Sequence, residues 1–491
     1  MTSAEAASGG LGIHWFRRNL RLDDNAALTA AGGGSRRLLC VFVVDEEQLR
    51  DEGIGPGRAR YQHDALAELD ATLRDHGGAL LVRQGDPARV LDELVAETGA
   101  VVVTAVADVT PFSRRREREV SAALRRRGIE LQLSSELFYT SPIATTHDDG
   151  RPYTVFSPYR RRFLAELQQV GTGDAMPPPL ANLLPLATIP AGRPLPTVES
   201  LGLHDLGQQL IPGGERAARQ RLTNFVAASD GLARYDQLRN IPQHQTSRLS
   251  ADLHFGTVGI RTVLREALAL RAGTSSTVVR RAVDAWVSEL CWRDFYAAVL
   301  YHFPYVRTLE FREDMRDLPW DDDESRFAAW CAGRTGYPIV DAAMRQLNTT
   351  GWMHNRCRMI VASFLTKDLH LDWRLGERYF LERLVDADVA NNNGGWQWAA
   401  STGTDPQPYF RIFNPVLQGK RFDPDGAYVR AHLPELGRLP AEVVHTPWLA
   451  RDASGSPGDY PRPIVDHATE RQVALAAYRA RSGRPPVRSP H

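Results

Sequence analysis

The chain carries two kinds of hydrophobic pattern, one in its first third and another in its second half. Between residues 11 and 140, short apolar runs rich in β-branched residues alternate with amphipathic stretches of helical period. Short runs of this kind favour buried strands, and the stretches between them favour helices. Strand–helix alternation predicts an α/β domain with a doubly wound parallel sheet. The expected strands are 12–16, 38–44, 79–82, 101–106 and 130–133, and the expected helices are 58–76, 87–98 and 112–127.

The pattern changes after this domain. Proline and glycine dominate residues 171–202, which predicts an extended linker within 141–214. From residue 215 to about 480, strand-like runs disappear and helical periods take over, so we expect an all-α C-terminal domain. The expected helices there are 216–228, 258–272, 279–302, 341–350, 355–369 and 375–386.

The segment 386–398, with the sequence DADVANNNGGWQW, does not read as an ordinary core helix. Asparagine and glycine lower helix propensity, and buried amides or carboxylates need hydrogen-bond partners. A small heteroaromatic ligand would supply those partners, with the two indoles as walls. A polar loop whose tryptophans anchor its exit is the alternative that this segment leaves open.

One expected helix presents a polar and aromatic face. Glu289, Trp292, Arg293 and Tyr296 stand at i, i+3, i+4 and i+7, so they share one side of the helix. Such a face can hydrogen-bond a base edge and stack on its ring. An intrahelical Glu–Arg pair beside core aromatics would explain the same spacing. A second expected helix has a similar face, formed by Asn355, Arg358 and Met359.

Residues 246–250, with the sequence TSRLS, precede a helix and follow Tyr235 and Arg239. Hydroxyls and free backbone N–H groups before a helix can cradle an anion such as a pyrophosphate. Ordinary helix capping would place the same residues there. The chain has no GxGxxG motif, so a Rossmann dinucleotide site is not supported.

Composition narrows the class of protein. A chain of 491 residues exceeds the size at which one core keeps growing, which predicts at least two domains. No window approaches eighteen uncharged apolar residues, residues 1–10 lack a signal pattern, and the four cysteines have no paired spacing. We therefore expect a cytoplasmic monomer with reduced thiols and no membrane span. The net charge of zero argues against a globally basic nucleic-acid protein but allows local arginine patches.

Together these segments resemble the DNA photolyase/cryptochrome family of flavoproteins, from Trp15 to about Pro415. Residues 15–25, WFRRNLRLDDN, are similar to the first strand and turn of the family. The segments similar to its helical-domain signatures, in order and spacing, are 246–250, 286–296, 352–359, 372–374 and 386–398. The resemblance implies an α/β antenna domain, a linker and a helical domain that binds FAD, with no metal.

The resemblance also implies roles for residues around FAD. Tyr235 and residues 246–250 would hold the phosphates, Arg358 and Asp386 would pair beside the isoalloxazine, and Asn392 would face the flavin N5. An amide at that position can donate or accept a hydrogen bond. The full set of implied cofactor-binding residues is Tyr235, Thr246, Ser247, Arg248, Leu249, Ser250, Trp286, Glu289, Arg293, Arg358, Asp386, Ala387, Asp388 and Asn392.

The implied substrate is a cyclobutane pyrimidine dimer in DNA, flipped into a pocket over the flavin, as in the base-flipping enzyme class that includes photolyases. Excited reduced flavin would give the dimer an electron, and the electron would return after ring splitting. The implied catalytic residues are Glu289 and Asn392, with Trp320, Trp373 and Trp396 as an electron-transfer chain. The implied DNA and substrate contacts are Arg239, Glu289, Trp292, Arg293, Tyr296, Asn355, Arg356, Arg358, Met359, Trp398 and Arg411.

Within the family, the class I cyclobutane-dimer branch is favoured over three alternatives. The (6-4) photolyases carry a histidine pair where this chain has His354 followed by Asn355. A cryptochrome photoreceptor usually signals through a long C-terminal extension, and here only the short tail 482–491 follows the last helical stretch. A flavoprotein that binds DNA without repairing it would keep the basic face and lose Glu289.

The antenna chromophore is expected to be 8-hydroxy-5-deazaflavin. Folate-binding members carry an Asn–Glu element where residues 108–115 read DVTPFSRR, without such a pair. The segment is more similar to the deazaflavin-binding form, which implies Arg58 and Asp108 as antenna contacts. Methenyltetrahydrofolate is the alternative.

Overall fold

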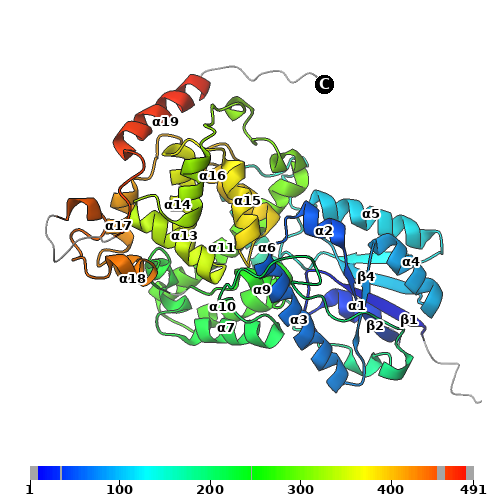
Figure 1. Cartoon of the computed structure of the whole chain (residues 1–491). Helices are drawn as coiled ribbons and strands as arrows, with labels where there is room; N and C mark the ends of the chain where they lie inside the picture. The colour runs from blue at the N-terminus through cyan, green and yellow to red at the C-terminus, as the bar shows by residue number, and fades with distance from the viewer. Residues whose placement is uncertain (1–8, 34–35, 245, 451–458, 483–491) are drawn as a thin grey trace, which may run out of the picture.

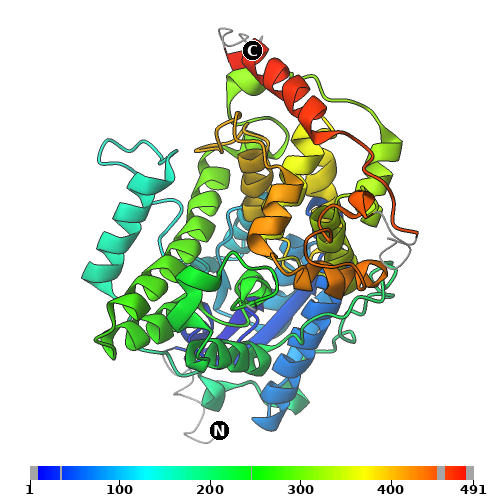
Figure 2. The ribbon, with the colours of Figure 1, turned by 90° about the vertical axis from the view of Figure 1, so that its left-hand side faces the viewer.

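The computed structural model describes residues 9–33, 36–244, 246–450 and 459–482, and most of the two terminal segments used above, 1–10 and 482–491, lies outside them. An α/β part, drawn in blue to cyan in Figure 1, packs beside a larger helical part drawn in green to red. Figure 2 views the helical part from the front, with the blue strands behind it. Of the described helices, none is long and apolar enough to cross a membrane.

A parallel five-stranded sheet organises the α/β part, in the order β3-β2-β1-β4-β5. The central strand β1 is buried from Gly12 onward, because it has a neighbour on each edge and helices on both faces. The doubly wound sheet confirms the predicted fold class. The strands are β1 (Leu11–Phe16), β2 (Arg37–Val44), β3 (Leu80–Gln84), β4 (Val102–Val106) and β5 (Glu130–Ser134).

Five helices accompany the sheet. Helix α4 begins as its sequence predicts, since Asp86 accepts hydrogen bonds from the N–H groups of Ala88 and Arg89, and Pro87 occupies the first turn. The sequence patterns did not predict α1 and α2, which are too short to show a period. The helices are α1 (Ala26–Gly32), α2 (Glu46–Asp51), α3 (Pro56–Asp75), α4 (Pro87–Thr98) and α5 (Pro111–Arg125).

The segment between the two parts is not wholly extended. It begins with helix α6 (Phe156–Val170), whose buried Tyr159 and Phe163 join the core of the helical part. The chain then returns along the sheet, where the N–H groups of Leu184 and Arg193 donate to β2 and β3 carbonyls at 2.8 and 2.9 Å. Two 3-10 turns, η1 (Leu180–Asn182) and η2 (Leu186–Thr188), lie on this path.

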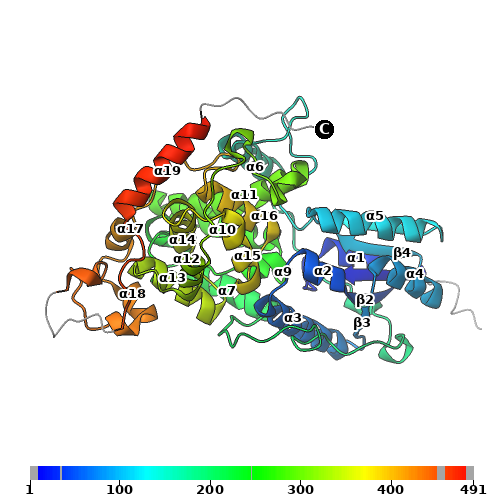
Figure 3. The same cartoon turned by 45° about the horizontal axis from the view of Figure 1, so that its top comes forward.

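The second half is built from helices and connecting loops, with no strand among its described residues, as predicted. The long α11 runs through it and α13 to α16 pack around one another (Figure 3). The helices are α7 (Glu215–Ala227), α8 (Tyr235–Leu238), α9 (Ser250–Phe255), α10 (Ile260–Ala272), α11 (Thr277–His302), α12 (Glu324–Ala332), α13 (Pro338–Thr350), α14 (Asn355–Lys367), α15 (Trp373–Arg383), α16 (Val389–Ala399), α17 (Pro415–Phe422), α18 (Ala427–His432) and α19 (His467–Ser482). The 3-10 turns are η3 (Leu232–Arg234), η4 (Pro304–Arg307), η5 (Glu313–Met315), η6 (Pro434–Leu436) and η7 (Pro447–Leu449).

The two parts approach each other through backbone as well as side chains. The N–H of Leu20 donates to the carbonyl of Phe255 at 3.0 Å. Gly256 follows in the left-handed region at φ +67°, and a Cβ on it would lie 2.0 Å from the carbonyl oxygen of Arg18. Only glycine satisfies both conditions.

We expect Gly256→Ala to destabilise the protein by about 2–4 kcal/mol, because the new methyl meets backbone across the interface. Gly128→Ala is the matched control, since Gly128 has φ +75° with nothing within 4 Å of an added Cβ. It should cost only the left-handed strain, about 1–2 kcal/mol. Urea unfolding measures both, and equal losses would contradict the close approach.

Candidate functional site

Helix α16 is the centre of the site, and it forms despite its asparagines and glycines. Asp388 caps it by accepting from the N–H of Asn391 at 3.0 Å. The amides of Asn393 and Gln397 both donate to the carbonyl of Val306 at 2.9 Å, so the helix buries them satisfied. The alternative of a polar loop is therefore wrong.

Glycine also sets how closely α16 packs on its neighbours. A Cβ on Gly394 would lie 2.1 Å from the Tyr296 ring on α11. A Cβ on Gly395 would meet nothing within 4 Å, so this side of the helix faces open space. The site thus has a close α11–α16 contact beside an open face.

Arg358 and Asp386 form an ion pair, as expected from the sequence. Nη2 of Arg358 donates to both carboxylate oxygens, at 2.8 and 3.1 Å, and Nε donates to the carbonyl of Met353 at 2.8 Å. The carboxylate is buried, whereas the guanidinium is partly open. A charge-assisted pair of this kind is rigid and has one accessible edge.

Asp388 lies in the interface between the α/β part and the helical part, where it binds Arg18. Nη2 of Arg18 donates to its Oδ2 at 2.6 Å, and Nη1 of the same guanidinium donates to Asp108 at 3.0 Å. Burial would raise the pKa of Asp388, but Arg18 and His254 outweigh it and hold this pKa well below its usual range. Arg18 therefore bridges a residue expected at the antenna and one expected at FAD.

Glu289 accepts a hydrogen bond from Nη1 of Arg239 at 2.6 Å. Arg293, one turn after Glu289, instead donates to Asp294 at 3.2 Å and to the carbonyl of Leu253 at 3.1 Å. The intrahelical Glu–Arg pair considered for this face is therefore wrong. Burial raises the pKa of Glu289, and Arg239 only partly offsets the shift.

The aromatic members of the same face stack together. The Trp292 ring lies 3.6 Å from that of Phe156 at an interplanar angle of 7°, and 5.5 Å from Tyr296. Helix α6 is held beside α11 by a 2.7 Å hydrogen bond from Arg160 to Ser288. Residues of the linker segment thus complete the wall around Trp292, which the sequence patterns did not indicate.

The loop 246–250 presents unpartnered donors. Helix α9, which begins at Ser250, has no side-chain cap. Arg248 has φ +51°, its Nε is buried without a partner among the described residues, and its guanidinium lies 4.3 Å from the Trp352 ring. The neighbouring Tyr235 is half-buried, and burial raises the pKa of its hydroxyl.

Asn392 donates from Nδ2 to the backbone carbonyl of Glu377 at 2.9 Å. Glu377 in turn accepts from Nδ2 of Asn393 at 3.0 Å, and burial raises its pKa to about 7. The sequence did not single out Glu377, because a glutamate within an amphipathic helix looks like a surface charge.

The expected tryptophan chain spans the core. Trp396 and Trp373 are buried and Trp320 is half-buried. Nε1 of Trp373 donates to the carboxylate of Glu310 at 3.1 Å, whereas Nε1 of Trp396 is buried without a partner in the described chain. Trp330, which the sequence patterns did not single out, lies 6.1 Å from Trp396.

The remaining residues that were expected to contact FAD or DNA differ in how exposed their side chains are. Asn355 and Arg411 are exposed, and Arg356 donates to Asn240 at 2.7 Å. Trp286 is buried 5.3 Å from the Phe225 ring. Partly exposed members of the set are Met359, Trp398, Thr246 and Ser247, and Leu249 is buried.

The two expected antenna contacts lie in the domain interface with their polar atoms engaged. Arg58 donates to four carbonyls, among them Leu381 at 3.0 Å and Ala387 at 3.2 Å in the helical part. Asp108 binds Arg18 and accepts from Ser113 at 3.2 Å. A hollow of about 40 Å³ beside Arg58 is lined by aromatic residues that include Trp15, Phe16 and Phe42.

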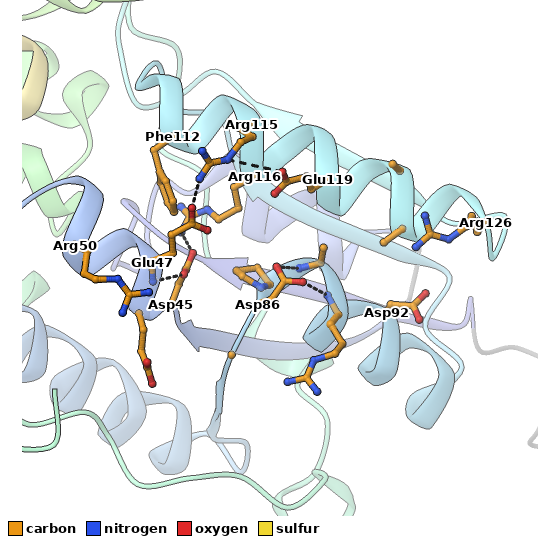
Figure 4. A pocket seen from close by; sticks show the side chains of 17 residues that line it. Asp45, Glu47, Arg50, Asp86, Asp92, Phe112, Arg115, Arg116, Glu119 and Arg126 are labelled. Atoms are coloured by element: carbon orange, nitrogen blue, oxygen red, sulfur yellow. Dashed lines mark hydrogen bonds and ion pairs between the residues drawn. The ribbon is translucent and has the colours of Figure 1, made fainter. Parts of the chain in front are cut away.

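A larger hollow of about 840 Å³ lies between α2, α4 and α5 (Figure 4). Its carboxylates are engaged by neighbours. Asp45 pairs with Arg116 at 3.0 Å, Glu47 pairs with Arg115, and Asp92 pairs with Arg127 at 2.6 Å. The charges lining this hollow are thus largely compensated within the α/β part.

The residues around α16 fit a flavin dinucleotide. Arg248 and the uncapped start of α9 offer donors for phosphates, and the Arg358–Asp386 pair offers a donor and acceptor edge for a ring. The space beside Gly395 allows a ligand to approach. Which atoms each residue contacts stays a prediction.

Comparisons with known proteins agree with these features. The family model described as DNA photolyase matches residues 12–181, and that described as the FAD binding domain of DNA photolyase matches residues 286–480. A deoxyribodipyrimidine photo-lyase of Synechococcus is 41% identical over 95% of this chain and 96% of its own. One of Halobacterium salinarum is 40% identical over 96% of this chain and 99% of its own.

Solved structures are similar over nearly the full length. A class III photolyase from Agrobacterium tumefaciens has a TM-score of 0.88 at 35% identity, covering 98% of this chain and 100% of that one. A Synechocystis cryptochrome has 0.85 at 29%, covering 96% and 99%. An archaeal photolyase from Sulfolobus tokodaii with two FAD molecules has 0.79 at 31%, covering 95% and 99%.

Glu377→Gln should gain stability over the wild type as pH rises. Because burial raises the pKa of Glu377 from 4.5 to about 7, the folded protein keeps a proton that the unfolded chain releases earlier. The wild type therefore loses stability between about pH 4.5 and 7, by about 1–3 kcal/mol, and the amide does not. Urea unfolding at pH 5 and pH 8 measures the difference.

Glu382→Gln is the matched control for this prediction, because Glu382 lies exposed on the same helix. As an exposed position it should change stability by no more than about 0.5 kcal/mol in either experiment. A Glu377→Gln effect that is equal at both pH values would show that the carboxyl ionises normally in the folded protein.

Proposed function

The chain belongs to the DNA photolyase family, and we propose that it is a deoxyribodipyrimidine photo-lyase that splits cyclobutane pyrimidine dimers in DNA under blue light. Curated relatives with that name align with almost the whole chain at about 40% identity. We assign it to the class I branch on the residues around Glu289 and Asn355.

The surroundings of Glu289 carry this proposal. The carboxyl is held by Arg239 at 2.6 Å, next to the aromatic wall of Trp292 and Tyr296 on the same helix face. Its raised pKa favours sharing a proton with the carbonyl or N3 edge of a pyrimidine. A hydrogen bond there stabilises negative charge that develops on the base.

Bound FAD supplies the light-absorbing electron donor. Arg248 and residues 246–250 would hold its phosphates, and the Arg358–Asp386 pair would hold its ring. Asn392, fixed by its hydrogen bond to Glu377, would present an amide to the flavin N5. Trp320, Trp373 and Trp396 would supply the electrons that keep the flavin reduced.

The flipped dimer lies against Trp292, which the Phe156 stack holds in place. Met359, Asn355 and Trp398 complete the pocket. Arg239 and Arg411 contact the DNA backbone, which positions the duplex without reading its sequence. Binding of this kind weakens as salt rises. Arg293, also expected to contact the backbone, is largely buried and its guanidinium already binds Asp294 and the carbonyl of Leu253. We propose that the protein works as a cytoplasmic monomer on damaged DNA.

Two other functions of the family fit less well. A (6-4) photolyase needs a histidine pair, whereas this chain has the single His354, which is buried, and burial lowers its pKa to about 4, which disfavours the imidazolium form. A cryptochrome photoreceptor is supported by the similarity to the Synechocystis structure. Glu289 with its aromatic wall favours repair over signalling.

We propose 8-hydroxy-5-deazaflavin as the antenna, in the hollow beside Arg58, whose lining is partly aromatic and partly polar, with methenyltetrahydrofolate as the alternative. Arg58 and Asp108 border this region through the interface contacts described above. The hollow of about 40 Å³ holds only a few waters, so a ring system enters only if side chains such as Gln48 or Gln62 move aside.

Glu289→Ala should repair a thymine dimer in an oligonucleotide about 10–100-fold more slowly than the wild type under blue light, because it loses the hydrogen bond to the dimer. Glu266→Gln, an exposed position on α10, is the matched control and should not change the rate. A wild type that binds FAD and leaves dimers intact would favour the photoreceptor.

The absorption spectrum of the protein purified from its natural source tests the antenna. A deazaflavin should add a band in the visible-blue region beside that of FAD, and Gln62→Trp should remove it by filling the hollow. A folate-like near-ultraviolet band instead of the deazaflavin band would overturn the proposal.

A further inference from the structure

Trp396 shares one hydrophobic core with two other tryptophans, Trp330 on α12 and Trp373 on α15. Its ring lies 6.1 Å from that of Trp330 on α12, at an interplanar angle of 67°. On α15, Gly376 packs directly beneath the indole, where a Cβ would lie 2.0 Å from Cη2. Trp373 stands one turn before Gly376 on the same face. Trp373 thus lies on the helix face that packs against Trp396, and Trp330 contacts the same ring from another helix.

The described residues that contact the Trp330 ring and its Nε1 are uncharged. The side chain is fully buried, and Nε1 donates to the backbone carbonyl of Val361 at 3.1 Å. Its ring neighbours are Phe327 at 6.0 Å, Tyr379 at 5.7 Å and Phe380 at 6.3 Å. A positive charge on this indole would be desolvated without a compensating anion, which is costly.

The surroundings of Trp373 carry net negative charge. Nε1 donates to the carboxylate of Glu310 at 3.1 Å, and Glu310 is 3% exposed. Arg374 lies 4.8 Å from the ring and opposes a positive charge there. That guanidinium is bound to Glu310 at 2.8 Å and to Asp372 at 3.0 Å, so two carboxylates face one cation. A positive charge on Trp373 is stabilised as a result.

We propose that Glu310 makes Trp373, and not Trp330, the residue that refills Trp396 with an electron during light-driven reduction of the flavin. The proposal rests on the proposed function and on its tryptophan chain. A positive charge on Trp396 is not stabilised in this way, because its buried Nε1–H has no hydrogen-bond partner in the described chain. The hole therefore moves from an unstabilised indole to one hydrogen-bonded to a carboxylate.

Each tryptophan that gives up an electron receives one from the next donor in the chain. One electron leaves Trp396 for the flavin, one from Trp373 refills Trp396, and one from Trp320 refills Trp373. A thiol in solution returns the electron to the half-buried Trp320. The indole proton of Trp373 stays in its hydrogen bond to Glu310. Glu310 thus acts by stabilising positive charge on Trp373 and takes no part in splitting the dimer.

Laser-flash absorption of the oxidised holoprotein, with dithiothreitol as reductant, tests the proposal. Glu310→Gln keeps an acceptor oxygen for Trp373 and removes the charge, so the yield of long-lived tryptophan radical should fall about tenfold. Trp330→Phe alone should leave this yield unchanged. In the Glu310→Gln background, however, Trp330→Phe should restore part of it, because the competing branch is closed.

Arg374→Gln should have the opposite effect on the stability of a positive charge on Trp373. It removes the cation beside Trp373, so the radical should recombine more slowly than in the wild type. A lifetime that is unchanged or shorter overturns the proposal, as does a Glu310→Gln yield equal to that of the wild type. This second variant keeps the test decisive if Glu310→Gln loses its FAD.

Two measurements separate this proposal from the proposed function. Glu313→Gln, an exposed neighbour of Glu310, is the matched control and should leave the radical yield unchanged. Repair by protein whose flavin is first reduced with dithionite should be the same for Glu310→Gln and the wild type. If the wild type repairs no dimers, the proposed function fails; if it repairs and Glu310→Gln reduces its flavin normally, only the role of Glu310 fails.

Discussion

The guanidinium of Arg18 holds the two halves of the molecule in one arrangement. It donates to Asp108 at 3.0 Å on one side and to Asp388 at 2.6 Å on the other, and both carboxylates are largely buried. Breaking a buried pair leaves an uncompensated charge, at a cost of about 3–5 kcal/mol. Because Asp388 also caps α16, the start of the central helix of the site is fixed from the opposite domain.

Much of the fold could be predicted from the sequence. Long amphipathic helices show a regular spacing of apolar residues, and buried strands show as short runs of β-branched residues. The strands and helices such as α11 and α14 lie close to their expected ranges. Helices α1, α2, α8 and α9 are too short to show a period. Helix α16 was not recognisable by propensity, because its cap and its buried amides find their partners only in the folded chain.

The site was predictable only in part, for a related reason. Residue types at helical spacing indicated the Glu289 face, whereas the Arg358–Asp386 pair was implied by the family resemblance, and the pair is present. No local pattern indicates that Arg239 binds Glu289, that Phe156 covers Trp292, or that Glu377 supports Asn392, since each contact joins separate helices. Arg58 and Asp108 were expected to bind the antenna, but their polar atoms already form hydrogen bonds with other groups of the protein.

The contacts of Arg58 bear on how such a protein can change over evolution. A side chain of the α/β part donates to the carbonyls of Leu381 and Ala387, which belong to the ends of α15 and the approach to α16. Main-chain acceptors are insensitive to substitution at their own positions, so the helical part can vary in sequence there without losing the contact. The arginine itself has no such freedom. An α/β part taken from a relative would therefore keep this contact only if it carries an arginine at this position.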